Sequence, residues 1–468
     1  MYNSIKSRVF SNGLYSEPFS CTVGVRQGEN LSPFLFAIYL NYLEDFLYSN
    51  NVKGLSFIST KFESELNVYL KLFVLLYADD TILLSETPED LQHQLTVFKN
   101  YCNYWHLKVN IDKTKVVIFG NSHTRKEVIP FTLNGEPLEI VDNFKYLGVL
   151  FCKNGSFNKN IRELFQKATK AMYGVIGKCR KHNLAVDCTL DMFDKIVKPV
   201  MLYGCEVWGY NQSILIEKLH LKFCKHILNV KPSTPNFMVY GELGRFPILI
   251  NIKVRMISFW CKLITTQGDK LSSLTFCLLR NYNNQWCNFI QSILNEYGLS
   301  YIWQTGQPVN TPWLKKIVFN TLYDQFKQLW YSDMFNSSKG VNYRIFKTSF
   351  GFESYLSNLP FKYLKYFCRF RTCNIKLPVE VGRWYNIPRE NRVCKICSKN
   401  EIGDEFHYLF ICNDPIISQS RMSYIPLYFY RNPNVYKFEQ LFNTKNKIKL
   451  IKLCRFIKII IERVSSPG

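Results

Sequence analysis

Two short apolar runs flank a pair of adjacent acids in the segment LLYADDTILL, residues 75–84. Short apolar runs on either side of turn-forming residues predict two strands and therefore a hairpin. Asp79 and Asp80 at its tip have two explanations. Acids are common in turns, because Asp hydrogen-bonds to its own backbone. Alternatively, two neighbouring carboxylates supply the hard oxygen ligands of a divalent cation.

The segments around this hairpin predict an α+β front. Residues 31–48 repeat apolar positions at helical spacing, with Ser32 as the expected cap and a proline in the first turn. Thr87 is the expected cap of a second helix. The buried stripe of that helix should contain Leu91, Leu95, Phe98, Cys102 and Trp105. Segments 107–120 and 131–151 are expected to be strands, with Asn-Gly and Asp-Asn turns between them.

From residue 156 onward the pattern becomes helical. Segments 158–181, 190–204 and 213–228 are amphipathic. The last of these places three lysines on one face, opposite an apolar stripe. They are Lys218, Lys222 and Lys225. Such a face either binds phosphates or is an ordinary solvated surface, and the spacing favours neither explanation.

Charge is distributed unevenly along the 468 residues. Residues 1–155 carry 14 Lys and Arg against 16 Asp and Glu, whereas the remainder carries 45 against 20, and the whole chain has a net charge of +23. Surface lysines keep many soluble proteins apart. An excess of this size over most of a chain nevertheless favours nucleic acid as the partner.

Cysteine usage and hydropathy narrow the compartment. The chain has 16 cysteines, and its start, MYNSIKSRV, lacks the apolar core of a signal peptide. We therefore expect a reducing, intracellular location, in the nucleus, the cytoplasm or both. No apolar run approaches the roughly 18 residues that a membrane span needs, so no membrane partner is expected.

A glycine-rich loop precedes the first expected helix. In GVRQGENLSPFLF, residues 24–36, Gly28 permits close approach of the backbone to a ligand, and Gln27 offers an amide side chain. Alone, this loop is a weak signal. It is followed in order by a helix, the YADD hairpin, a capped helix, an Asn-x-x-Lys-Thr element at residues 110–114 and the strand FKYLGV, and this order is specific.

This order resembles the reverse transcriptase domain of non-LTR (LINE-type) retrotransposons. The Gly-x-x-Gln-Gly segment, the YADD hairpin and the Asn-x-x-Lys-Thr element are similar to blocks of that family's palm, although the usual Gly-Leu at residues 106–107 reads His-Leu here. Residues 144–149 resemble its primer grip, residues 197–209 a thumb-region element, and residues 383–412 a C-terminal Cys/His box. The interval 260–360 carries no recognised block.

The resemblance implies a partial right-hand palm that transfers nucleotides with Mg²⁺ or Mn²⁺. The implied partners are an RNA template and a DNA target or primer, with deoxynucleotides as the only small-molecule substrates. Asp79 would ligate the metal, with Asp80 beside it in support. The implied template- or nucleotide-binding residues are Arg26, Gln27, Gly28, Tyr77 and Lys113. Lys113 either neutralises or protonates the departing pyrophosphate or is plain surface.

One carboxylate of that palm has no counterpart in this sequence. The family places a further metal-binding Asp upstream of the Gly-x-x-Gln-Gly segment, whereas the only acid before Gly28 is Glu17, in an expected loop. The fingers domain that holds the incoming nucleotide is not recognised either. We therefore expect an N-terminally truncated polymerase that is inactive, or nearly so, by itself.

A second constellation is Cys394-x2-Cys397-x9-His407-x4-Cys412. Three thiolates and one imidazole suit tetrahedral Zn²⁺, with two ligands on a tight turn and two on one helix. The alternative is that these cysteines are small buried hydrophobic residues.

Cations and aromatic residues precede the Cys/His constellation. Arg383, Arg389 and Arg392, with Trp384 and Tyr385, can contact phosphates and stack on bases. Packing of Trp384 into the zinc module is the competing explanation.

The patterns divide the chain into five regions. They are a partial palm (1–155), a thumb-like helical domain (156–260), a helical connector (261–375), a Cys/His zinc module (376–425) and a basic C-terminal helix (426–468).

Two functions remain open: an RNA-directed DNA polymerase of a retrotransposon, and a non-catalytic nucleic-acid-binding protein derived from one. A group II intron maturase fits less well, because the Cys/His box and the YGCEVWG element have no place there.

Overall fold

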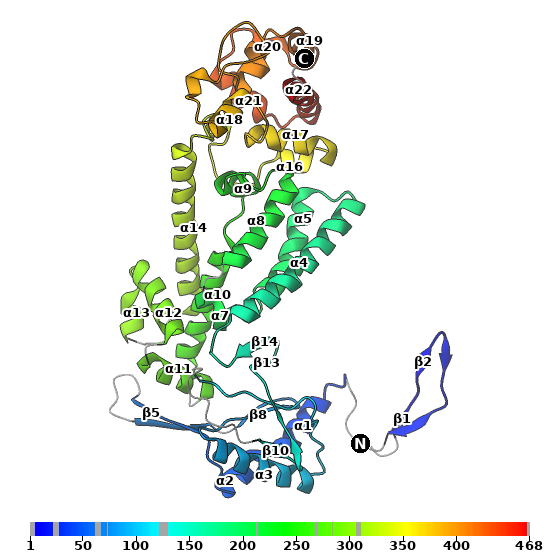
Figure 1. Ribbon diagram of the computed structural model, residues 1–468, viewed down its shortest axis with the longest axis vertical. Helices are drawn as coiled ribbons and strands as arrows, with labels where there is room; N and C mark the ends of the chain where they lie inside the picture. Colours follow the sequence, from blue (N-terminus) through cyan, green and yellow to red (C-terminus); the bar gives the residue numbers. More distant parts are fainter. Residues whose placement is uncertain are drawn as a thin grey trace. The chain divides into compact units, whose positions relative to one another are not determined.

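The computed structural model describes residues 5–21, 28–60, 67–72, 74–120, 130–211, 214–266, 270–282, 284–305 and 310–465. The chain forms two compact units (Figure 1). Residues 1–146, 150–156 and 269–282 make the first, and residues 147–149, 157–268 and 283–468 make the second. The first unit mixes strands and helices, whereas the second consists mainly of helices, so the chain is mostly helical.

The first unit combines a few helices with short strands that pair two by two. Its helices are α1 (Ser32–Leu40), α2 (Leu43–Ser49), α3 (Pro88–Tyr104) and α11 (Leu271–Asn281). The antiparallel pairs are β1 (Ile5–Ser7) with β4 (Phe19–Cys21), β2 (Phe10–Ser11) with β3 (Leu14–Tyr15), β5 (Leu55–Thr60) with β6 (Asn67–Leu72), β7 (Val74–Tyr77) with β8 (Asp80–Leu83), and β10 (Thr132–Leu133) with β11 (Glu136–Pro137). β9 (Lys115–Val116) pairs in parallel with β12 (Glu139–Ile140), and β13 (Asn143–Tyr146) pairs with β14 (Val149–Cys152).

Helix α3 organises the first unit because two of its faces are covered. The Thr87 side chain caps it by accepting a hydrogen bond from the Asp90 amide, as the sequence predicts. On one face Val97 and Tyr101 pack with residues of α1 and α2, and on another Leu95 packs with residues of β9 and β10. The predicted stripe is buried or half-buried, but the buried part of α3 is wider than one stripe because two layers cover the helix.

The single helix expected over residues 31–48 is wrong. The structure has two helices there, and Ser32 is the first helical residue of α1 rather than its cap, a position that Leu31 takes. The break follows from Asn41, whose amide donates to the carbonyl of Ile38 three residues back instead of four. Asn is a weak helix former, so it ends the helix at little cost.

The strands after α3 are shorter than expected. In the stretch 107–120 only Lys115–Val116 is paired, because the Asn110 side chain accepts from the Lys113 amide and holds this segment in a turn. The Asn134–Gly135 turn is confirmed: both residues have positive φ, as a two-residue hairpin turn between β10 and β11 requires. Asp142 lies between β12 and β13, but these two strands do not pair with each other.

The second unit is a set of packed helices. They are α4 (Asn158–Lys181), α5 (Val186–Met192), α6 (Lys198–Met201), α7 (Cys205–Trp208), α8 (Ile214–Leu228), α9 (Asn236–Leu243), α10 (Ile248–Thr265), α12 (Gln285–Glu296), α13 (Ser300–Thr305), α14 (Thr311–Asn336), α15 (Tyr343–Phe346), α16 (Tyr355–Asn358), α17 (Phe361–Arg371), α18 (Pro378–Trp384), α19 (Pro415–Tyr424), α20 (Leu427–Tyr430), α21 (Val435–Phe442) and α22 (Lys447–Ser465). Short turns of other helix types lie at Phe193–Val197, Gly209–Asn211, Arg389–Asn391 and His407–Ile411.

Helix α10 lies at the centre of one part of this unit, in contact with α7, α8, α12 and α14. Its Trp260 is buried and stacks on Trp303 of α13 at 5.8 Å between ring centroids.

The helices predicted over 158–181 and 213–228 are confirmed as α4 and α8. Among the described helices, none combines the length and the apolar character needed to cross a membrane. The division into five regions stays a prediction.

Candidate functional site

The predicted hairpin around the acidic pair is confirmed. β7 and β8 pair in the register Tyr77 with Asp80, so that Ala78 and Asp79 form a two-residue turn. Ala78 has a φ of 54°, the left-handed region that glycine usually occupies in such turns. Both carboxylates are exposed at the tip. The base of the hairpin is anchored, since Val74 packs on the α1–α2–α3 cluster and Leu83 on the cluster around Leu95.

Within the first unit the hairpin lies beside the strand that resembles the primer grip. Burial, followed by electrostatic interaction with Asp80 and Tyr77, raises the pKa of Tyr146 at the end of β13. The Tyr146 phenol therefore lies close enough to the Asp80 carboxylate for an electrostatic interaction. Two segments that are separated by more than 60 residues in the sequence thus come together around the acidic pair.

In the second unit the turn after β13 contacts the thumb-like element. The Tyr203 hydroxyl donates to the carbonyl of Leu147 at 2.7 Å, and a Cβ added at Gly148 would meet the Tyr203 ring at 2.8 Å. The Trp208 indole donates to the Tyr203 carbonyl at 2.9 Å and is itself fully buried. The segments FKYLGV and LYGCEVWG, which the sequence presents as separate blocks, therefore meet through Leu147–Gly148.

The other residues expected near the acidic pair are only partly placed. Arg26 and Gln27 lie outside the described residues. Gly28 is exposed, with a φ of 88°, and among the described residues no atom lies within 4 Å of an added Cβ, so its conformation favours glycine. Tyr77 is 61% exposed. Lys113 was expected on a strand, but it lies exposed in the turn that Asn110 holds.

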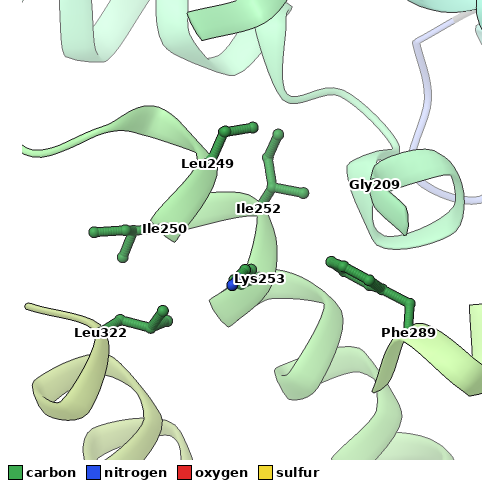
Figure 2. Close-up of a pocket in the computed structure, with 7 residues that line it drawn as sticks. All are labelled: Gly209, Leu249, Ile250, Ile252, Lys253, Phe289 and Leu322. Atoms are coloured by element: carbon green, nitrogen blue, oxygen red, sulfur yellow. The ribbon is translucent and has the colours of Figure 1, made fainter. Parts of the chain in front are cut away.

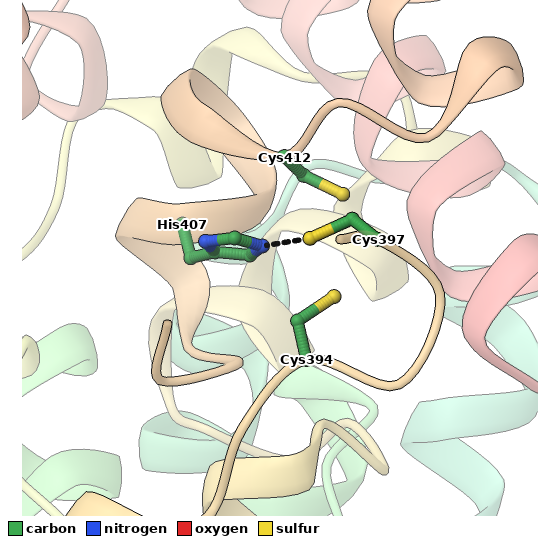
Figure 3. Close-up of side chains that lie close together, drawn as sticks. All are labelled: Cys394, Cys397, His407 and Cys412. Atoms are coloured by element: carbon green, nitrogen blue, oxygen red, sulfur yellow. Dashed lines mark hydrogen bonds between the residues drawn. The ribbon is translucent and has the colours of Figure 1, made fainter. Parts of the chain in front are cut away.

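The Cys/His constellation closes into a cluster (Figure 3). One potential ligand atom from each of Cys394, Cys397, His407 and Cys412 lies within 4.8 Å of all the others. Figure 3 shows the sulfurs of Cys394 and Cys397 close to the His407 ring and to Cys412. His407 begins the short helical segment His407–Ile411, and Cys412 follows it directly. A tetrahedron with bonds of about 2.0–2.3 Å has edges of about 3.3–3.8 Å, so small side-chain shifts suffice to hold a metal ion.

Hydrogen bonds and burial support this cluster. His407 Nε2 lies 3.3 Å from Cys397 Sγ, and its Nδ1 lies 3.3 Å from a carboxylate oxygen of Glu401. The hydrogen bond between Cys412 and Cys394 lowers the pKa of Cys394, against its burial, and raises the pKa of Cys412. The thiolate is the form of cysteine that ligates metal.

The comparison with known families concerns the first unit. Residues 2–151 match the family described as reverse transcriptase (RNA-dependent DNA polymerase). These residues are therefore similar to the reverse transcriptase family. The expected resemblance to a reverse transcriptase domain is thereby confirmed, and the matched residues include the hairpin, Gly28 and the FKYLGV segment.

Known proteins similar to this chain come from mobile elements. The RNA-directed DNA polymerase from mobile element jockey of Drosophila melanogaster is 24% identical over 232 residues, which are 47% of this chain and 23% of that protein. The probable RNA-directed DNA polymerase from transposon BS of the same species is 26% identical over 196 residues, 42% and 21%. The retrovirus-related Pol polyprotein from type-1 retrotransposable element R2 of Popillia japonica is 30% identical over 139 residues, 28% and 21%. Each match thus spans less than a quarter of the relative's own length.

Outside the reverse transcriptase domain, the three lysines of α8 differ in their surroundings. Lys218 and Lys222 are exposed, and Lys222 Nζ lies 5.3 Å from the centre of the Tyr173 ring of α4. Lys225 is half-buried and donates to the Pro232 carbonyl at 2.7 Å. The predicted shared face is therefore present, but Lys225 is already engaged within the protein.

The three arginines ahead of the Cys/His cluster make intramolecular contacts. Arg383 pairs with Glu380 at 3.2 Å, and Arg389 with Asp404 at 3.0 Å. Arg392 donates to the Ile387 and Val379 carbonyls at 2.8 and 2.9 Å. These contacts tie the loop before Cys394 to helix α18 and to the segment before His407.

Trp384 and Tyr385 remain accessible, with exposed fractions of 51% and 73%. Lys231 Nζ lies 5.4 Å from the centre of the Trp384 ring. The Trp384 ring is therefore not packed into the core of the Cys/His module.

Sequence reasoning missed the residues that hold the cluster. Arg421 of α19 is buried and donates to the carbonyls of Leu409, Tyr408 and Cys412, so that it ties down the segment carrying two of the potential ligands. The Asp404 side chain accepts from the His407 amide at 3.0 Å. Asp404 lies three residues before His407, which is the spacing of a helix cap, so its role could have been predicted from the sequence. The sequence contains no comparable signal for Arg421.

A shallow pocket in the second unit is unrelated to these sites (Figure 2). It is lined by apolar side chains of α10, α12 and α14 and by the single charged residue Lys253. Lys253 Nζ lies 3.8 Å from Glu296. This lining offers no carboxylate to bind a metal ion, so the pocket has none of the chemistry of nucleotide transfer.

Proposed function

We propose that this chain takes part in RNA-directed DNA synthesis for a non-LTR retrotransposon, with Asp79 as a ligand of Mg²⁺ or Mn²⁺ and Asp80 beside it. The observation that carries the proposal is the two-residue turn of the YADD hairpin, which exposes both carboxylates within a domain of the reverse transcriptase family. An RNA template and a DNA primer or target are the proposed partners, inside the cell, where both occur together with deoxynucleotides.

The chain's own residues would orient the reaction. The metal ion, when bound, stabilises negative charge on the attacking 3′ oxygen and the departing pyrophosphate. Asp79 and Asp80 present their oxygens at the exposed tip of the hairpin. We assign the backbone at Gly28 and the side chains of Arg26, Gln27 and Tyr77 to the template or the incoming nucleotide. Lys113, exposed in its turn, is assigned to the pyrophosphate.

Primer extension on polyadenylate primed with oligodeoxythymidylate tests the polymerase proposal, with Mg²⁺ or Mn²⁺ as the ion. We expect Asp79→Ala to lower any extension at least about 100-fold, the usual scale for loss of a group that stabilises transition-state charge. Glu136→Gln is the matched control, since it neutralises another exposed carboxylate of the same unit. Extension that survives Asp79→Ala contradicts the assignment. The expectation that this polypeptide alone has little activity stays a prediction, and the same assay tests it.

A second readout does not depend on activity. Fe²⁺ in place of Mg²⁺, with ascorbate and peroxide, cuts the backbone close to a bound ion, and we expect cuts at residues 77–81 that vanish in Asp79→Ala. If no cut appears there and the chain nevertheless binds RNA with a steep salt dependence, the alternative of a non-catalytic nucleic-acid-binding protein is favoured.

We further propose that Cys394, Cys397, His407 and Cys412 hold Zn²⁺ as a structural ion. The donor set supports this, because closed sites of three thiolates and one imidazole are typical of structural zinc. Glu401, near His407 Nδ1, would orient the imidazole toward the ion.

Metal analysis of the purified chain tests the zinc proposal. We expect one Zn²⁺ per chain in the wild type and its loss in Cys412→Ser. Cys188→Ser is the control, because Cys188 is an exposed thiol outside the cluster. A chain that contains zinc after Cys412→Ser, or none before it, contradicts the assignment.

A further inference from the structure

Helices α17 and α22 of the second unit present a basic surface that belongs to none of the sites above. The two helices pack against each other. The cations on this surface are Lys362 and Lys365 of α17 and Lys447, Lys449, Lys452 and Arg455 of α22. We call these six residues the α17–α22 surface. Arg455 Nε lies 3.4 Å from the hydroxyl of Tyr363, so cations from both helices meet around one tyrosine.

The opposite sides of the same helices are fixed in the core. Phe367 and Cys368 of α17 and Leu453, Cys454 and Ile457 of α22 are all fully buried. Burial, together with the neighbouring Cys368, raises the pKa of the Cys454 thiol, which places the two cysteines close together. The orientation of both helices, and with it the position of the basic side chains, is therefore set by packing.

Carboxylates are scarce around this surface. Segment 361–371 contains no acid, and neither does segment 415–424, the α19 helix that packs against α22. The single acid within α22 is Glu462, which lies 3.5 Å from Lys458. In the part of the chain that the structure describes, none of the six cations forms an ion pair. Their mutual repulsion is left uncompensated by the protein.

The start of α22 adds a second unfavourable charge arrangement. The Asn446 side chain caps the helix by accepting from the amides of Ile448 and Lys449. The first turn then carries Lys447 and Lys449 and no acid. Cations at this end oppose the helix dipole, which favours negative charge there. An anion bound at this surface would relieve both the repulsion and the dipole conflict.

Aromatic rings alternate with the cations on α17. Lys362 Nζ lies 5.1 Å from the centre of the Tyr363 ring, and Lys365 Nζ lies 4.8 Å from the centre of the Tyr366 ring. Both tyrosines are half-exposed. Cations interleaved with accessible rings contact phosphates and stack on unpaired bases, which is the pattern of single-stranded nucleic-acid binding.

We propose that the α17–α22 surface binds the backbone of single-stranded nucleic acid. This contact lies outside the reverse transcriptase domain and does not depend on the polymerase site. An anionic membrane is the weaker partner, because an interfacial helix needs a free apolar face. The apolar side of α22 is instead buried in the protein, at Leu450, Leu453, Cys454, Phe456, Ile457 and Ile460.

The full chain binding a fluorescein-labelled 20-nucleotide oligouridylate, followed by anisotropy between 50 and 200 mM KCl, tests this proposal. The variant Lys362→Gln/Lys452→Gln/Arg455→Gln removes three cations. We expect the slope of log affinity against log salt to fall by about 2, and the affinity at 0.1 M salt to fall by about 100-fold. The same titration with oligodeoxythymidylate shows whether the strand bound is RNA, DNA or either.

A charge-matched control separates this surface from the net charge of the chain. Lys315→Gln/Lys316→Gln/Lys327→Gln removes three cations from α14, of which Lys315 and Lys316 are exposed and Lys327 is half-buried and paired with Asp324, and we expect it to change the slope much less. Arg455→Lys keeps the charge and should bind as the wild type does. Asp79→Ala should also bind as the wild type, which keeps this test independent of the polymerase site.

Three results would overturn the proposal. They are an unchanged slope in the α17–α22 variant, equal weakening in the α14 variant, and loss of binding to vesicles with 30% phosphatidylserine while oligonucleotide binding is kept. Thermal unfolding guards against misfolding, because neutralising unpaired exposed cations should leave the midpoint at or above that of the wild type.

Discussion

At the scale of single residues, the acidic pair depends on an unusual neighbour. Ala78 takes the left-handed conformation that the two-residue turn demands at its first position. That conformation costs about 1 kcal/mol for a residue with a Cβ. Ala78 disfavours this conformation, whereas glycine adopts it freely. The pairing of β7 with β8 therefore holds the turn in place, against the preference of Ala78 itself.

Ala78→Gly should therefore stabilise the hairpin by up to about 1 kcal/mol, because the relief of strain outweighs the added freedom of the unfolded chain. Hydrogen-exchange protection of the β7 and β8 amides measures the effect. Ala37→Gly on the exposed side of α1 is the matched control and should destabilise by about 0.5–1 kcal/mol, since glycine weakens a helix interior. A loss of protection in Ala78→Gly would argue that the left-handed residue is not strained.

At the scale of elements, helix α4 carries two glycines on its exposed side. One side buries Leu164, Ala168 and Met172, whereas Gly174 and Gly177 lie on the exposed side. An added Cβ at either glycine would meet no atom within 4 Å. Each glycine costs the helix up to about 1 kcal/mol relative to alanine, and no tertiary contact offsets that cost.

Gly174→Ala and Gly177→Ala are each expected to raise the free energy of unfolding by about 0.5–1 kcal/mol. Urea unfolding followed by circular dichroism gives the measurement. Gly241→Ala, in the buried helix α9, is the opposite case, because its Cβ would lie 2.8 Å from Trp330 Nε1. That substitution should lower stability by about 1–3 kcal/mol. The idea fails if the α4 variants are as damaging as Gly241→Ala.

At the scale of the whole molecule, a buried charge cluster joins helices that are far apart in the sequence. Arg371 of α17 donates to both carboxylate oxygens of Glu242 of α9, at 3.0 and 3.1 Å, and all these groups are fully buried. Tyr355 also donates to Glu242, and Arg371 lies 3.2 Å from Glu353. Burial alone would raise the pKa of Glu242, but the charges of Arg371 and Lys347 lower it.

The lowered pKa sets the direction of a pH dependence. Glu242 is more acidic in the folded chain than in the unfolded chain, so its contribution to stability is present above about pH 4.5 and is lost as the pH falls through its folded pKa. Glu242→Gln should cost about 3 kcal/mol at pH 7, because it leaves Arg371 with less compensation in the core. The difference in the free energy of unfolding between Glu242→Gln and the wild type should be smaller in acid. Urea unfolding of both proteins at pH 7 and at pH 4 measures it.

An exposed pair provides the comparison for that prediction. Lys195 and Asp191 lie 3.2 Å apart with both side chains mostly exposed, so Asp191→Asn should cost less than about 0.5 kcal/mol. If Glu242→Gln were equally mild and independent of pH, the buried cluster would not be a source of stability.

Local patterns were sufficient for the features that short segments decide. The YADD hairpin, the Thr87 cap and the extent of α4 follow from apolar spacing, turn residues and capping, which act over a few neighbouring positions. The convergence of Cys394, Cys397, His407 and Cys412 was also predictable, because their spacing suits one metal ion. The break at Asn41 and the turn held by Asn110 were not, since in each case a local hydrogen bond competed with an equally apolar helix or strand pattern.

By itself, therefore, the sequence predicted which segments could carry chemistry and showed the similarity of residues 2–151 to reverse transcriptases. The tertiary structure alone decided which of those segments meet. The contact of Tyr203 with Leu147, the placement of Tyr146 near Asp80 and the burial of Arg371 against Glu242 join residues that are tens to more than a hundred positions apart. Such pairings depend on how buried faces of different elements fit together, and the periodicity within one element contains no information about its partner.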